Sequence, residues 1–160
     1  MNKVRFFVAI VPFLLCSCYS YVVFPEKYRE LPDSAPNSSA FVLNPELDQE
    51  YRIMKSSGIF TVSSDSTCPT RIYLHELAQS RACGNTLFPG VFLTLGLLPM
   101  YAPDRYYYSF DQISGTDTTH LKFELKVATR VSFWEIFQSQ KDLDPKLAKA
   151  LKGEYLELNN

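Results

Sequence analysis

The side chains most able to do chemistry in this sequence are those of its two histidines and four cysteines. His75 falls within one segment of alternating polar and apolar residues, and His120 opens another. His75-Glu76 has no second histidine at the spacing of the zinc-binding H-E-x-x-H pattern. Phosphate-binding, dinucleotide-binding and nucleophile-elbow patterns are absent as well. We therefore expect no catalytic residue, no metal site and no cofactor, and we interpret both histidines as surface or structural residues.

The first 18 residues are typical of an export signal. Two basic residues precede an uncharged run of about ten residues, far shorter than the roughly 20 apolar residues of a spanning helix. Leu15-Cys16-Ser17-Cys18 follows this run and resembles the lipobox of bacterial lipoproteins, in which an aliphatic and two small residues precede the modified cysteine. The resemblance implies that residues 1–17 are a signal peptide and that Cys18 is lipidated. An ordinary secretory signal and an uncleaved anchor are the alternatives.

The resemblance also implies a location. Lipoproteins carry two or three acyl chains such as palmitate, and more than one chain is needed for stable membrane binding. In Gram-negative bacteria an aspartate after the cysteine marks retention in the inner membrane. Because Tyr19 follows Cys18 here, we expect the protein to be anchored in the outer membrane and to face the periplasm.

Once the resemblance assigns Cys16 and Cys18 to the signal and the lipid, Cys68 and Cys83 are the two cysteines left. An even pair in an oxidising compartment predicts a disulfide. It would close a loop of about 15 residues and stabilise the fold by about 3 kcal/mol. A metal pair is disfavoured because ligand spacing is lacking, and a redox couple is disfavoured because C-x-x-C is absent.

The composition predicts one domain without a nucleic-acid footprint. The chain has 160 residues, with 16 basic and 17 acidic side chains and a net charge of −1, so a basic face for nucleic acid is not expected. Prolines and small polar residues make residues 18–40 a predicted lipidated N-terminus and flexible tether. Residues 41–160 are then the globular domain.

The patterns in this domain predict an α+β fold, in which an antiparallel sheet of four or five strands packs against one N-terminal helix. That helix is expected over 45–57, with Asn44 as N-cap and Gly58 after its end. A C-terminal helix capped by Asp144 is expected to end at Gly153. Alternating segments predict strands at 59–63, 71–77, 105–113 and 120–130.

The last two segments form a predicted hairpin around the turn SGTDTT. One face should be buried, and it comprises Tyr106, Tyr108, Phe110, Leu121, Phe123, Leu125 and Val127. Tyr107 would then be exposed and able to stack on a partner. Trp134, the only tryptophan, lies in an aromatic segment that covers the sheet or touches the membrane interface. Tyr107 and Trp134 are the candidate interaction surface.

Residues 82–103 contain no charge. Val91 to Leu98 are expected to form a buried strand, because prolines and glycines interrupt the run too often for an easy membrane helix. A surface in contact with lipid or a partner is the alternative.

These features favour a membrane-anchored envelope lipoprotein, not an enzyme, that binds another envelope protein or helps to maintain the envelope. A small-molecule or lipid-binding lipoprotein is the alternative. A hydrolase would need His75 or His120 beside a nucleophile and a carboxylate.

Overall fold

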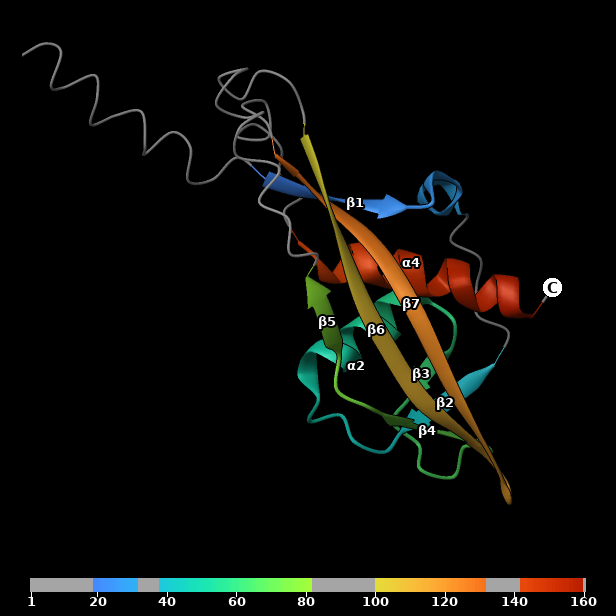
Figure 1. The fold of residues 1–160 in the computed structure, drawn as a ribbon. Helices are drawn as coiled ribbons and strands as arrows, with labels where there is room; N and C mark the ends of the chain where they lie inside the picture. Colours follow the sequence, from blue (N-terminus) through green and yellow to red (C-terminus); the bar gives the residue numbers. More distant parts are fainter. Residues whose placement is uncertain (1–18, 32–37, 82–99, 132–141, 160) are drawn as a thin grey trace, which may run out of the picture.

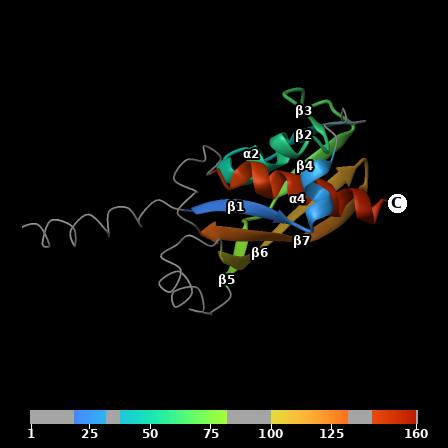
Figure 2. The same ribbon diagram turned by 90° about the horizontal axis from the view of Figure 1, so that it is seen from above.

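The structure is a computed structural model that describes residues 19–31, 38–81, 100–131 and 142–159. Two helices and one 3-10 helix in this part of the chain accompany a single curled sheet, and both helices lie on one face of it (Figures 1 and 2). The elements are β1 (Tyr19–Phe24), η1 (Glu26–Glu30), β2 (Ser39–Val42), α2 (Asp48–Ser57), β3 (Thr61–Ser63), β4 (Thr70–Leu74), β5 (Ala78–Arg81), β6 (Met100–Ser114), β7 (Asp117–Val131) and α4 (Asp144–Leu158).

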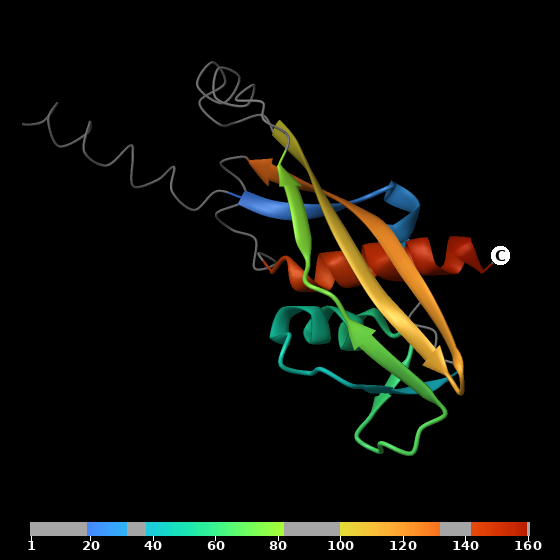
Figure 3. The same ribbon diagram turned by 60° about the horizontal axis from the view of Figure 1, so that its bottom comes forward.

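The sheet is mixed and has seven strands among the described residues, in the order β1-β7-β6-β4-β2-β3 with β5 paired to β6. The predicted α+β class is confirmed, but the predicted antiparallel sheet of four or five strands is wrong. β2 runs parallel to both β3 and β4. Parallel neighbours need a crossover connection, and α2 supplies it between β2 and β3. Figure 3 shows β4 and β5 following one another along the same side of β6.

The hairpin of β6 and β7 is the long axis of the sheet. The pair Ser114 and Asp117 closes it, so the connecting loop is only Gly115 and Thr116, with Gly115 at φ 64°. Two-residue loops of this kind favour glycine at positive φ and match the twist of the strands. The predicted buried face is confirmed except that Leu121 is half-buried; its buried members are Tyr106, Tyr108, Phe110, Phe123, Leu125 and Val127.

α2 begins at Asp48, three residues later than the sequence predicts. Asn44 is not its N-cap. Its amide instead donates to the carbonyl of Leu74 and accepts from the Leu74 N–H, both at 2.8 Å, in a buried position. Two buried hydrogen bonds to the end of a strand stabilise the fold more than one capping hydrogen bond would. The predicted end is confirmed, because Gly58 adopts a left-handed φ of 63°.

α4 begins at Asp144, whose side chain makes no capping bond. Its carboxylate instead accepts from Gln49 Nε2 and Arg52 Nε of α2, each at 3.0 Å. The helix also continues past Gly153 to Leu158. Gly153 is not a terminator; a Cβ there would lie 2.4 Å from the ring of Tyr28, so the glycine gives that ring room to pack.

Residues 19–31 are folded, although the sequence places them in a flexible tether. β1 pairs along its whole length with β7. η1 follows and buries Tyr28, which is 3% exposed, against α4. Burial of Val23 and Tyr28 outweighs the turn signal of the nearby proline, which only separates strand from 3-10 helix.

Candidate functional site

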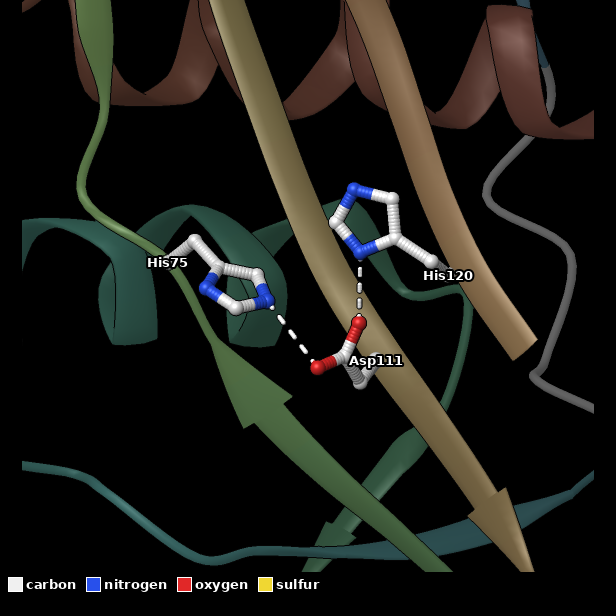
Figure 4. A group of neighbouring side chains, drawn as sticks. All are labelled: His75, Asp111 and His120. Atoms are coloured by element: carbon white, nitrogen blue, oxygen red, sulfur yellow. Dashed lines mark hydrogen bonds and ion pairs between the residues drawn. The ribbon is translucent and has the colours of Figure 1, made fainter. Parts of the chain in front are cut away.

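Two histidines converge on one carboxylate on the sheet face opposite the helices (Figure 4). His75 Nε2 lies 3.1 Å from Asp111 Oδ2, and His120 Nδ1 lies 2.6 Å from Asp111 Oδ1. The two imidazole rings stand 5.3 Å apart between centroids at an angle of 64°. We call these three residues the His–Asp–His cluster.

The hairpin register places two of the three side chains. Asp111 pairs directly with His120 across β6 and β7, so their side chains share one face. The two-residue loop at Gly115 sets this register, and a slip of one residue would move His120 to the other face.

His75 reaches the cluster from the residue after β4. Tyr73 of β4 pairs with Asp111, and two residues later His75 leans back over the same face. The His75 N–H donates to the carbonyl of Ser109 at 3.1 Å, and the Tyr73 ring meets the imidazole edge-on at 5.4 Å. The side chain of Asn44 fixes the preceding residue, Leu74, through the two hydrogen bonds to its backbone described above.

The cluster is accessible and electrostatically complementary. The exposed fractions of the side chains are 36% for His75, 25% for Asp111 and 58% for His120. The hydrogen bond from His120, followed by the one from His75, holds the pKa of the Asp111 carboxyl below its usual range against partial desolvation. A carboxylate anion therefore lies between two nitrogen donors at the pH of most compartments.

The chemistry of this donor set is that of a transition-metal ligand group. One atom of each side chain can be chosen so that the three lie within 4.8 Å of one another. Two ligands of a tetrahedral zinc ion are about 3.3 Å apart, given bonds of about 2.0 to 2.1 Å. The present distances of 3.1 Å and 2.6 Å run to different oxygens of Asp111, so a bound ion would require the side chains to close around it and to lose the shared protons. Two imidazoles and a carboxylate suit zinc, nickel or copper better than calcium or magnesium, which prefer all-oxygen sites.

The sequence places the two histidines in separate segments, whereas the structure brings their side chains together. They lie in one cluster because β4 and β7 flank β6 on its two sides. A relay for hydrolysis would also need a nucleophile at an imidazole. In the described parts of the chain, no serine, threonine or cysteine side chain hydrogen-bonds to His75 or His120.

The residues singled out from sequence lie apart from this cluster or outside the described residues. Tyr107 is half-buried on the same sheet face, with the Lys122 ammonium 5.4 Å from its ring centroid. Cys68 is half-buried in the β3–β4 connection. Cys18, Cys83 and Trp134 lie outside the described residues, as do the signal peptide and the predicted strand from Val91 to Leu98. The disulfide between Cys68 and Cys83 therefore stays a prediction.

Comparison with known proteins gives no family assignment: no protein family matches the chain, and no curated protein matches it in sequence. Neither helix in the described ranges is long and apolar enough to cross a membrane.

Proposed function

We propose that this chain is an outer-membrane lipoprotein, anchored through Cys18 and facing the periplasm, that binds a divalent transition-metal ion and docks a partner protein through it. The observation that carries the metal site is the convergence of His75, Asp111 and His120, with ligand atoms within 4.8 Å of one another. The support for the anchor is the lipobox-like Leu15 to Cys18.

The position of the cluster suits a docking role. Asp111 lies eleven residues along β6 from Met100, about 35 Å away at the rise of a strand. Tyr19, the residue after Cys18, pairs with Val131, which also pairs with Met100. A domain held at Cys18 would therefore present the cluster far from the anchored end, where another envelope protein can approach it.

Three protein ligands leave a coordination position open. Structural zinc sites complete four protein ligands, whereas sites with three keep a position for water or an incoming donor. Here a side chain of the partner supplies that donor, and the exposed His120 makes the site reachable. The role of the site is binding, without a chemical reaction. Tyr107 and Lys122, on the same face, extend the contact surface.

Metal titration of the purified protein tests the site sharply, because the sequence holds only two histidines. The protein is prepared without a polyhistidine tag and titrated with zinc, nickel and copper ions by calorimetry, with magnesium and calcium as comparisons. We expect one transition-metal ion per chain. His120→Ala and Asp111→Asn should each weaken metal binding by at least about tenfold. Loss of a group that only hydrogen-bonds to a metal ligand already has an effect of about that size.

Two matched variants complete that experiment. Asp117→Asn removes an exposed carboxylate from the same hairpin, and Cys68→Ser removes a sulfur atom that lies outside the cluster. Both should bind zinc like the parent protein. Equal affinity of the Asp111→Asn and Asp117→Asn variants would rule out the cluster as the metal site.

The anchor is tested separately by mass spectrometry of the mature N-terminus after palmitate labelling. We expect acyl chains on Cys18 in the parent protein, and loss of lipid with release from the membrane in Cys18→Ser. An unmodified Cys18 in membrane-bound protein would refute the anchor while leaving the metal site untouched.

A further inference from the structure

A basic pocket lies beside the first strand, at the other end of the hairpin from the His–Asp–His cluster. Its volume is about 370 Å³, and strands β1, β6 and β7, the 3-10 helix and the first turns of α4 contribute to its walls. Its described lining residues include four basic side chains and no acidic one. The described lining as a whole consists of Ser20, Tyr21, Val22, Val23, Arg29, Tyr101, Arg130, Lys146 and Lys149.

Two of the basic side chains in this pocket contact oxygen atoms of neighbouring residues. Arg29 Nη1 pairs with the exposed Glu26 at 2.7 Å, and its Nε donates to the Val23 carbonyl at 3.1 Å. Lys149 Nζ lies 3.5 Å from the Arg29 carbonyl. Partial burial, together with the charges of Lys149 and Arg29, lowers the pKa of the Lys146 ammonium. Cations that repel one another across a pocket are a site that an anion would stabilise.

The lining also contains donors suited to phosphate. Lysine binds phosphate as a point charge, and arginine binds it through a planar fork of N–H groups. Tyr101, another lining residue, is an exposed aromatic side chain, able to rest at the level of lipid headgroups with its hydroxyl in water.

The pocket is next to the predicted lipid attachment point. Ser20, which lines it, is two residues after Cys18, and two residues of extended chain span about 7 Å. Ser20 pairs with Arg130, which pairs with Tyr101, so three lining residues form one row across the sheet. An acyl chain on Cys18 would bring this row to the headgroup layer.

We propose that the pocket formed by Arg29, Arg130, Lys146 and Lys149 binds the phosphate of an anionic phospholipid headgroup in the membrane that holds the lipid anchor. This inference rests on the proposed anchoring at Cys18 and deepens it. The acyl chains supply attachment, and the pocket sets the orientation of the domain, with β1 against the bilayer and the hairpin turn away from it.

Native mass spectrometry of the full-length mature protein, released from detergent micelles, tests the pocket directly. Bound ligand is counted during titration with dioleoyl phosphatidylglycerol, dioleoyl phosphatidylcholine or inorganic phosphate. We expect phosphatidylglycerol to bind most tightly. The double variant Lys146→Gln/Lys149→Gln should bind it about tenfold more weakly, because two charge-assisted contacts are lost.

A charge-matched variant gives the control. Lys55→Gln/Lys126→Gln removes the same net charge from exposed positions on α2 and β7, and it should change the affinity by less than about twofold. Equal weakening in both double variants would overturn the pocket in favour of bulk charge. Inorganic phosphate that displaces phosphatidylglycerol at equal concentration would overturn the headgroup and assign the pocket to soluble phosphate.

The outcome is separable from the fate of the anchor, because the same spectra report the mass of the acyl chains on Cys18. Lipidated protein that does not distinguish phosphatidylglycerol from phosphatidylcholine refutes the pocket alone. Selective binding by unlipidated protein refutes the anchor and supports the pocket.

Discussion

The two ends of the β6–β7 hairpin differ in how their charges are balanced. Near the turn, one carboxylate lies between two imidazoles, with nitrogen–oxygen distances of 3.1 Å and 2.6 Å. Near Met100 and Val131, four basic side chains surround a pocket whose described lining contains no acid. Both oxygens of the carboxylate at the turn end therefore have a nitrogen partner, whereas the described lining at the end beside β1 is basic.

The ends also differ in what assembles them. The cluster depends mainly on one hairpin register and on the end of β4. The pocket depends on β1, η1 and α4, which lie at opposite ends of the chain. A site built by local register should survive damage that detaches the chain termini. A site built from distant segments should not.

Gly153→Ala is expected to have the largest effect on this contrast. The added methyl would meet the Tyr28 ring at 2.4 Å, and overpacking of this kind costs about 3 kcal/mol of unfolding free energy. Helix propensity alone predicts the opposite sign, a gain of up to about 1 kcal/mol. Denaturant unfolding decides between them.

The double variant Gly153→Ala/Tyr28→Ala provides the control, because removal of the ring makes room for the methyl. Its cost should be smaller than the sum of the two single changes. In folded Gly153→Ala protein, phosphatidylglycerol binding should weaken more than zinc binding. Equal losses at both ends would contradict their independent assembly.

Asn44→Ala should damage the turn end selectively. The change removes two buried hydrogen bonds of 2.8 Å to the backbone of Leu74, the residue before His75. Leaving those groups unsatisfied costs about 2 kcal/mol, and the freed strand end should weaken zinc binding as well. Asn159→Ala, at the exposed end of α4, is the matched control and should change neither the free energy of unfolding nor the zinc affinity. Unchanged zinc affinity in Asn44→Ala would show that Leu74 does not position His75.

Local patterns predicted the hairpin well. Two-residue alternation identified its buried face, and Gly58 was correctly placed after the first helix. The sequence predicts a longer turn, SGTDTT, and therefore strands that are shorter than β6 and β7. A loop of only Gly115 and Thr116 pairs Asp111 with His120. The contact between these two residues of the cluster could therefore have been predicted from the sequence.

The remaining features depend on contacts between distant segments. No pattern near His75 indicates that β4 pairs with β6, because pairing partners are chosen by the whole sheet. Gly153 looks like a helix terminator locally, and only the ring of Tyr28 explains its position. The prolines near η1 likewise suggested a tether, although burial of the neighbouring side chains makes that segment part of the fold.

Asp111→Asn should have a smaller effect on stability than either change above. In metal-free protein the loss of charge-assisted contacts to two histidines costs about 1 kcal/mol at neutral pH. Since the pKa of Asp111 is lowered in the folded state, this contribution is present above the ordinary value of about 3.9 and is lost as the pH falls through the lowered pKa. Urea unfolding of both proteins from pH 7 to pH 3 measures the difference. A difference that grows towards pH 3 would have the wrong sign for an ionised Asp111.

Lys146→Gln should have the smallest effect, and its sign is opposite. The lowered pKa of Lys146 means that its charged form is less favourable in the folded state than in the unfolded chain. Removal of the charge should therefore stabilise the protein at pH 7, by less than about 0.5 kcal/mol because solvent screens the site. The advantage should shrink in high salt and as the pH rises through the lowered pKa, where the parent side chain loses its own proton. Lys126→Gln, from an exposed strand position, should be neutral. Destabilisation by Lys146→Gln in low salt would show that the cations are already balanced, and the contrast between the two ends would then be lost.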